Sequence, residues 1–223
     1  MVEAFRIGLI VFVAVLLAAG FGVLLPLRVR RRRASGQTFS EWAARHGWQF
    51  EMAPLVPWTA RLPGRNPTGL GATLTGELGG HQVTVADYSY PTSTWNGEVV
   101  HTITHRCVVV VVLLERPYPP VAVVDVAALS QPGSGLFSDS PVPTGHRDFD
   151  HRFRVTAVDT NYARLLVGPQ LIAAHLAGVV PRWSLAGHEL LSYQTGRLGD
   201  PDAIPDLAAP VLHLASLIER RAH

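Results

Sequence analysis

The residues that could most readily do chemistry in this chain are two histidines four positions apart, His101 and His105. Imidazole is the commonest metal ligand in proteins, and a pair at this spacing can chelate one ion when it lies on a helix. These two lie in the run VVHTITHRCVVVVVLLE, whose β-branched residues predict a strand. Residues four apart on a strand are about 13 Å apart along one face, which is too far to share an ion. We therefore expect no metal site.

A second candidate is a pair of carboxylates, Asp148 and Asp150, in the run DFDHRFRVTAV. The alternation of this run predicts a strand, which would place both carboxylates on one face about 7 Å apart. Such a pair could serve acid–base chemistry or bind a cation. Because Arg147, Arg152 and Arg154 flank the pair, we favour a solvated ladder of charges over a site.

Three further histidines, His81, His188 and His213, have no carboxylate partner in the neighbouring sequence, and we interpret each as structural or surface-exposed. Cys107 is the chain's one cysteine and directly precedes an apolar run. A single thiol forms neither an internal disulfide nor a four-ligand zinc site, and its apolar setting favours an inert core residue.

Motifs of the common enzyme classes are missing from the sequence. It contains no G-x-S-x-G nucleophile elbow, and a chain without lysine cannot supply the lysine of a phosphate-binding loop. We therefore expect no catalytic residues and no cofactor, and classify the chain as non-enzymatic.

The charge distribution separates the N-terminal segment from the rest. Residues 1–33 carry six arginines against the single acid Glu3, whereas the remainder carries thirteen arginines against sixteen acids. The high isoelectric point therefore comes from the N-terminal segment, and nothing in the remainder favours nucleic-acid binding.

That N-terminal segment has the length and flanks of a membrane anchor. Residues 7–27 form an uncharged run of 21 residues, about 31 Å as a helix, which is enough to cross a bilayer. The stretch LAAGFG could be taken for a signal cleavage site, but the arginines that follow are typical of a stop-transfer signal. These arginines, which could also contact anionic lipid, are Arg28, Arg30, Arg31, Arg32 and Arg33.

The positive-inside rule then places the N-terminus outside the inner membrane and the remainder in the cytoplasm. We divide the chain into a short extracytoplasmic N-terminus, a transmembrane helix, a basic juxtamembrane linker and one cytoplasmic domain, over residues 1–6, 7–27, 28–37 and 38–223.

The domain should begin with a helix, because Thr38 and Glu41 have the spacing of a capping box and Gly47 could end it. After an irregular proline-rich stretch, two alternating runs joined by Gly79 and Gly80 predict a hairpin over residues 72–90, polar on one face and covered on the other. In that register Leu78 pairs with His81, Gly76 with Val83 and Leu74 with Val85.

The later elements follow as separate segments. We expect strands over 99–115, 118–126 after a proline-rich turn, and 148–158; a mobile loop over 130–146; two short helices over 159–178; a second hairpin over 182–196; and a final helix over 206–223. The fold class is therefore α+β, with a mainly antiparallel sheet of six or seven strands, terminal helices and an inserted helix pair.

One aromatic residue, Trp95, lies in SYPTSTWNGE at what the sequence predicts to be a loop tip. An indole exposed there could contact a partner or the membrane. We favour the alternative, that it packs back on the sheet.

Four segments carry a resemblance to known proteins: EWAARHGWQF after the basic-flanked span, GELGGHQVTVADYSY, FRVTAVDTNYARLLVGPQL, and WSLAGHELLSY. With these, the chain resembles a group of actinobacterial single-pass membrane-anchored proteins of unknown function. Its layout is also similar, more distantly, to the mycobacterial trehalose monomycolate transport factors, accessories of a lipid exporter. The resemblance includes no catalytic residues.

The leading hypothesis is a membrane-anchored, non-enzymatic accessory or scaffold protein whose cytoplasmic domain binds a membrane-protein complex, in cell-envelope lipid transport. The first alternative is a domain that holds a lipid or envelope precursor between sheet and helix, which requires a cavity of about 300 Å³ or more. The second is an enzyme of unrecognised type, which should place polar groups of perturbed pKa together in a cleft.

Overall fold

The structure is a computed structural model, and it describes residues 36–95, 97–126 and 141–221. The predicted transmembrane helix and its five flanking arginines lie outside these residues, as does most of the predicted 130–146 loop. Within the described ranges, no helix combines the length and the apolar character that a membrane crossing requires.

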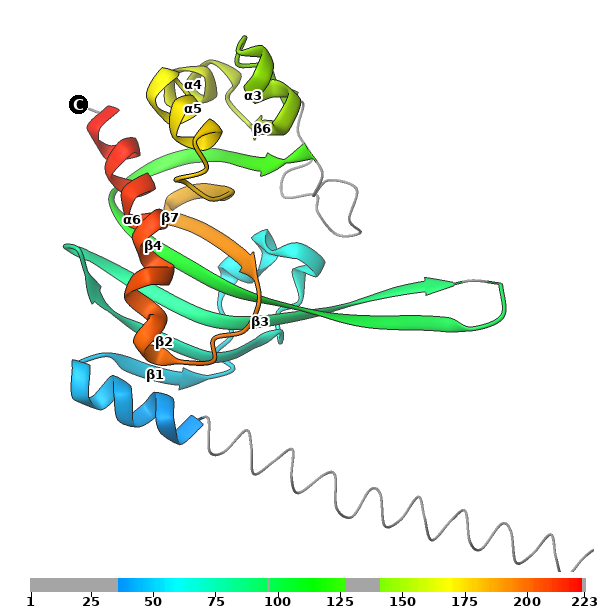
Figure 1. Cartoon of the computed structure of the whole chain (residues 1–223), viewed down its shortest axis with the longest axis vertical. Coiled ribbons are helices and arrows are strands. Elements are labelled where there is room, and N and C mark those ends of the chain that lie inside the picture. The colour runs from blue at the N-terminus through cyan, green and yellow to red at the C-terminus, as the bar shows by residue number, and fades with distance from the viewer. Residues whose placement is uncertain (1–35, 96, 127–140, 222–223) are drawn as a thin grey trace, which may run out of the picture.

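The predicted α+β class is confirmed, with seven antiparallel strands in one sheet (Figure 1). Their order is β1-β2-β3-β4-β6-β5, and β7 pairs with β4 off this path. The strands are β1 (Gln49–Met52), β2 (Leu70–Leu78), β3 (His81–Trp95), β4 (Val100–Asp125), β5 (Pro141–Val142), β6 (Phe153–Ala157) and β7 (Trp183–Thr195). The helical segments are residues 36–46, η1 (Pro57–Arg61), η2 (Pro63–Arg65), α3 (Arg147–Arg152), α4 (Thr160–Leu166), α5 (Pro169–Leu176), η3 (Pro201–Ala203) and α6 (Ile204–Arg221).

The β2–β3 hairpin has the predicted register, with Leu78 opposite His81 and Gly76 opposite Val83. Its two-residue turn needs positive φ at both central positions, and Gly79 and Gly80 have φ of 60° and 81°. Glycine adopts these angles without steric cost, so the turn fixes the register of the whole hairpin.

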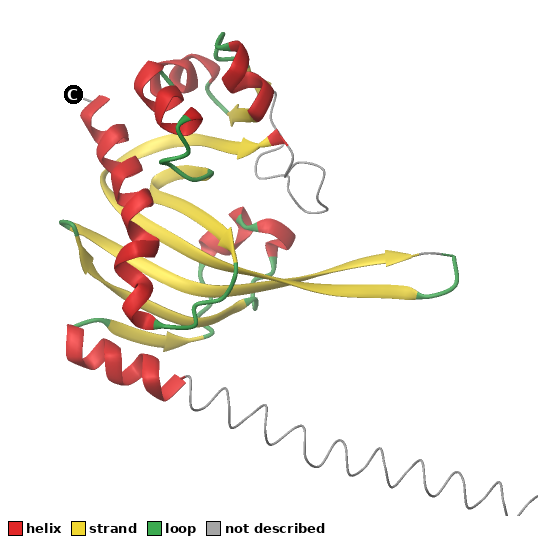
Figure 2. Ribbon diagram, in the orientation of Figure 1, coloured by secondary structure: helices red, strands yellow, loops and turns green. Residues whose placement is uncertain are grey.

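The predicted break between strands at the prolines of residues 117–120 is wrong, because β4 runs for 26 residues without a turn. The pairing with β7 shifts register on either side of Tyr118, so this stretch forms an irregular bend within the strand rather than a turn. The predicted second hairpin over residues 182–196 is also wrong, because these residues form one strand instead of two. β7 is one strand that follows β4 through the bend (Figure 2). Gly187 lies opposite Tyr118 and has a φ of 57°.

The expected strand over 148–158 begins instead with helix α3, so Asp148 and Asp150 do not share a strand face. Capping decides this: His146 Nδ1 accepts a hydrogen bond from the amide of Phe149, which is completely buried. The carboxylate of Asp150 accepts hydrogen bonds from the Thr144 hydroxyl and from the backbone just before the helix. These local bonds outweigh the alternating pattern.

The inserted helix pair and the final helix occur as predicted. The capping box predicted at Thr38 is wrong, because the first helix already includes Gly36 and Thr38 lies inside it. Asp159 caps α4 by accepting a hydrogen bond from the amide of Tyr162, and Pro169 is the first residue of α5. Helix α6 buries Val211, Leu214 and Ile218 against the sheet.

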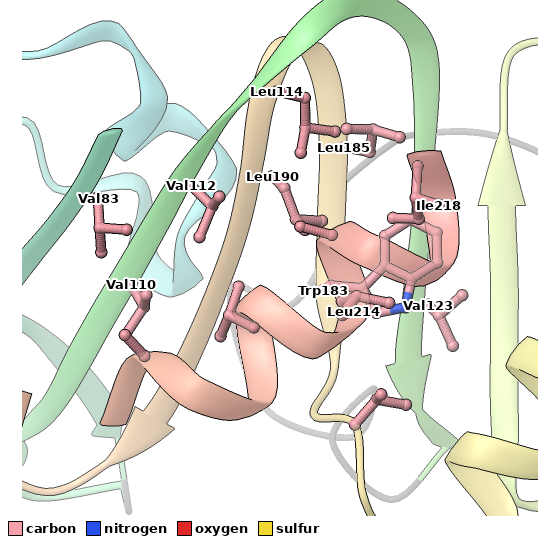
Figure 3. Packing of buried hydrophobic residues seen from close by; sticks show 14 of the residues in the cluster. Val83, Val110, Val112, Leu114, Val123, Trp183, Leu185, Leu190, Leu214 and Ile218 are labelled. Carbon is pink, nitrogen blue, oxygen red and sulfur yellow. The ribbon is translucent and has the colours of Figure 1, made fainter. Parts of the chain in front are cut away.

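The sheet is covered on both faces, whereas the hairpin pattern predicted a cover on one. The larger core lies between the sheet and α6, where Leu214 and Ile218 face Val123, Trp183 and Leu185 (Figure 3). A smaller cluster on the opposite face packs Trp58 and Leu62, from η1 and the residue after it, against the sheet.

Candidate partner-binding arm

Strands β3 and β4 extend beyond the sheet as a two-stranded arm, formed by residues 90–95 and 100–105 (Figures 1 and 2). Six residue pairs connect the two strands, from Tyr90–His105 at the base to Trp95–Val100 at the tip. At about 3.4 Å per residue the arm is about 20 Å long. In the part of the chain that the structure describes, no other strand pairs with it.

The base of the arm is held by the irregular segment between β1 and β2. The hydroxyl of Tyr88 donates a hydrogen bond to the carbonyl of Pro63 (2.8 Å) and accepts one from the amide of Asn66 (2.8 Å). The Asn66 side chain also donates to the carbonyl of Ser89 (3.0 Å). Gly64 lies so close to the ring of Tyr90 that a Cβ on this glycine would be 2.6 Å from it. The direction of the arm is therefore set by the body of the domain.

Along the arm, side chains bond across the strands. The hydroxyls of Ser93 and Thr102 are 3.0 Å apart, and the Thr92 hydroxyl is 2.8 Å from Nε2 of His105. The ring of His105 also stacks on Tyr90 at a centroid distance of 4.9 Å. These cross-strand pairs stabilise a ribbon that has no third strand beside it.

The outer part of the arm exposes apolar side chains to solvent. Trp95 is 63% exposed, and Val99, Val100 and Ile103 are exposed to a similar degree. Trp95 and Val100 are direct cross-strand partners and share one face, whereas Ile103 lies on the other. Between Ser89 and Arg106 the sequence has one formally charged residue, Glu98.

A two-stranded ribbon that exposes several apolar side chains is unusual for a surface in contact with water alone. An isolated two-stranded ribbon is marginally stable, and clustered exposed apolar side chains typically mark an interaction site. The favoured interpretation, that Trp95 packs back on the sheet, is wrong, because Trp95 lies at the outer end of the arm and is largely exposed. Its contact with a partner stays a prediction.

The histidine pair at the arm lies on a strand, as predicted, and the two residues do not converge. His105 bonds to Thr92, while His101 is exposed near the tip. No cluster of three or more potential metal ligands occurs within the described ranges.

The other predicted histidines have structural positions, and one has a partner that the local sequence did not indicate. Nδ1 of His81 is 3.2 Å from the carbonyl oxygen of Leu113, and its Nε2 is 3.6 Å from the carboxylate of Glu219 on α6. Nδ1 of His188 contacts the carbonyl of Leu114, and His213 is exposed. His81 is therefore structural, as interpreted, and its carboxylate partner comes from a distant part of the sequence because α6 crosses the end of the hairpin.

The space between sheet and helix is small. The hollow there, next to Val108, Tyr193 and Val211, has a volume of about 30 Å³, far below what a lipid requires. A larger hollow of about 290 Å³ lies at the end of α6, but charged side chains line it, including Glu115, Arg116 and Glu219. Neither has the apolar lining and size that the lipid-binding alternative needs.

Three groups with a shifted pKa lie in packed regions away from both hollows, whereas Tyr193, whose pKa is raised by burial, lines the smaller hollow. Burial lowers the pKa of His175 to about 4 within the larger core. Burial raises the pKa of the Cys107 thiol, which is 4% exposed and lies in the smaller cluster, as expected of an inert thiol. Desolvation lowers the pKa of Arg61, although its ion pair with Glu189 opposes the shift. None of these three groups lines either hollow.

Local sequence reasoning missed the arm, although one signal for it was present. Uncharged residues, many of them β-branched, continue on both sides of positions 96–98, and they extend past the last residues that β2 could pair. Residues 57–66, which hold the base of the arm and which we call the holding segment, have no periodicity in the sequence and gave no such signal.

Comparison with known proteins supports the fold. No protein-family model and no curated protein matches the chain. Among solved structures, the crystal structure of the mycobacterial trehalose monomycolate transport factor A is similar, with a TM-score of 0.54 and 17% sequence identity. The match covers 83% of this chain and 94% of that chain. The expected distant resemblance to this transport factor is therefore confirmed at the level of the fold.

Proposed function

We propose that the protein is a membrane-anchored, non-enzymatic accessory protein whose domain binds a membrane-protein complex in cell-envelope lipid transport. The shared fold supports this function, because the similar protein is described as a transport factor for trehalose monomycolate. The uncharged run over residues 7–27 and the arginines after it support an inner-membrane anchor with the domain on the cytoplasmic side.

The observation that carries the proposal is the arm. It places Trp95 and Val100 on one face of a two-stranded ribbon, well away from the body of the domain. Hydrogen bonds to the body hold the base of this ribbon. Tryptophan is enriched at binding hot spots because one side chain buries a large apolar area with few rotatable bonds. The fitting partner is a groove on the cytoplasmic side of a membrane protein, lined by apolar and aromatic side chains.

The proposal is tested by affinity purification of the full chain from detergent-solubilised membranes of its native host. The wild type is compared with the double variant Trp95→Ser/Val100→Ser. A matched control, Val158→Ser/Val179→Ser, removes two exposed apolar side chains (71% and 52% exposed) away from the arm.

We expect wild type and control to recover the same membrane protein in near-stoichiometric amount, and the arm variant to recover at least tenfold less. Recovery of no stoichiometric partner by the wild type would count against the accessory function. Equal recovery by the arm variant would exclude the arm as the contact. Thermal unfolding of all three proteins shows whether the substitutions leave the domain intact.

A further inference from the structure

A second exposed apolar surface runs from Met52, the last residue of β1, to Pro57, the first residue of η1. Residues 52–57 read MAPLVP, so six consecutive residues carry no charge and no polar side chain. Leu55 is 75% exposed and Met52 is 53% exposed, and two further residues of the loop are exposed as well. The amide of Ala53 donates to the carbonyl of Gly71 (2.8 Å), which ties the loop to β2. We call residues 52–57 the apolar loop.

The apolar loop lies where the chain enters the domain. Gly36 is the first residue that the structure describes, and a Cβ on Gly36 would be 3.4 Å from the terminal methyl of Met52. In the sequence, Gly36 follows Arg33 by three residues. Three residues span at most about 11 Å, so the apolar loop lies close to the end of the basic segment.

The entering helix cannot swing freely away from the loop. Phe39 and Trp42 on residues 36–46 are 3% and 5% exposed. Phe39 stacks on Phe50 of β1, the strand that leads into the apolar loop. The indole of Trp42 donates a hydrogen bond to the carboxylate of Asp202 (2.6 Å) in η3, directly before α6. The helix, β1 and the apolar loop are therefore packed against one another.

We propose that the apolar loop inserts Met52 and Leu55 into the interfacial region of the bilayer, as a second membrane contact beside the anchor. This inference rests on the proposed anchor, whose arginines would lie at headgroup depth. The basic segment supplies attraction to anionic headgroups, and the uncharged loop supplies apolar side chains at nearly the same height. Two contacts fix the orientation of the domain on the membrane, and with it the direction of the arm.

The test uses the full chain reconstituted into vesicles of phosphatidylcholine and phosphatidylglycerol. Leu55→Cys and Val158→Cys are each labelled with an environment-sensitive fluorophore. The native Cys107 is buried, so the labelled wild type serves as the blank. Val158 is equally exposed (71%) and follows β6, at the opposite end of the molecule from the entering helix (Figure 1). Spin-labelled lipids then quench any fluorophore that lies in the interface.

We expect blue-shifted emission at position 55 and at least threefold stronger quenching there than at position 158. Equal quenching at the two positions overturns the inference. A fluorophore at position 55 that is shielded from solvent in native membranes but not in vesicles of pure lipid would mean that a protein covers the loop. That result also overturns the inference. Alkaline carbonate extraction separates the two proposals: a chain that is extracted has no anchor, whereas a retained chain with an unquenched loop refutes the loop contact alone.

Discussion

A buried histidine should make the domain acid-sensitive. His175 on α5 is 1% exposed and lies beside the rings of Phe149 and Phe153. Its Nε2 accepts a hydrogen bond from the indole of Trp183 (2.9 Å), so the proton of the neutral ring is on Nδ1. Protonation would place a positive charge among apolar side chains and break the bond to Trp183.

The size of the effect follows from the shift in pKa. Burial lowers the pKa of His175 from 6.5 to about 4 in the folded state. Because the unfolded state then binds more protons between these values, the free energy of unfolding falls as the pH falls below 6.5. At about 1.4 kcal/mol per pKa unit, the loss is about 2 kcal/mol between pH 7 and 5 and about 3 kcal/mol by pH 4. That is a large part of the 5 to 15 kcal/mol that stabilises a typical domain, so the effect is measurable.

The assay is urea unfolding of the full chain in detergent micelles, followed by tryptophan fluorescence at pH 5, 6, 7 and 8. His175→Gln keeps an oxygen that can accept the indole hydrogen bond and has no titrating group. We expect the wild type to lose about 2 kcal/mol more than this variant between pH 7 and 5. His213→Gln removes an exposed imidazole and should behave as the wild type. Equal pH dependence in wild type and His175→Gln would refute the reasoning.

Three further predictions concern the packing of the domain. Glu189→Ala leaves the guanidinium of Arg61 buried without its carboxylate and should destabilise the domain by about 3 kcal/mol, a value at the low end because Glu189 is partly exposed; urea unfolding measures it. Gly76→Ala should cost about 1 to 3 kcal/mol, because its Cβ would lie 2.4 Å from the ring of Trp48, and thermal unfolding detects this loss. Cys107 should react with a thiol reagent only after unfolding, since burial both shields the thiol and raises its pKa.

Each of these has a matched comparison. Gly199→Ala adds a methyl group where no atom lies within 4 Å, so it should leave the melting temperature unchanged. Glu219→Ala removes a carboxylate from the weaker contact with His81 and should cost less than Glu189→Ala. Reaction of Cys107 in the native state at the rate of an unfolded control would show that the smaller cluster opens readily.

Local signals predicted those parts of the fold that depend on neighbouring residues. The register of the first hairpin follows from Gly79 and Gly80, and the start of α4 follows from Asp159, because turns and caps are determined within a few residues. Alternation misled at residues 148–152, where the cap and the burial of Phe149 form a helix instead.

The prediction of a turn at the prolines of β4 was wrong because the structure there depends on long-range strand pairing. Whether such a stretch turns or continues depends on the strand beside it, and β7 pairs with β4 on both sides of the bend. The partner of His81 was missed for the same reason, since Glu219 is 138 positions away in the sequence. The holding segment at residues 57–66 has no periodicity, so its cover of the second face of the sheet was not predictable.

By itself, the sequence determined the α+β class, the first hairpin, the cap of α4 and the absence of common catalytic motifs, because each depends on local backbone preference or on residue type. Only the tertiary structure decided that Trp95 lies at the end of a projecting arm and that the apolar loop lies beside Gly36. Both features depend on where β2 stops pairing with β3 and on how residues 36–46 pack. Exposure is set by the elements that cover a side chain, and those elements come from distant parts of the chain.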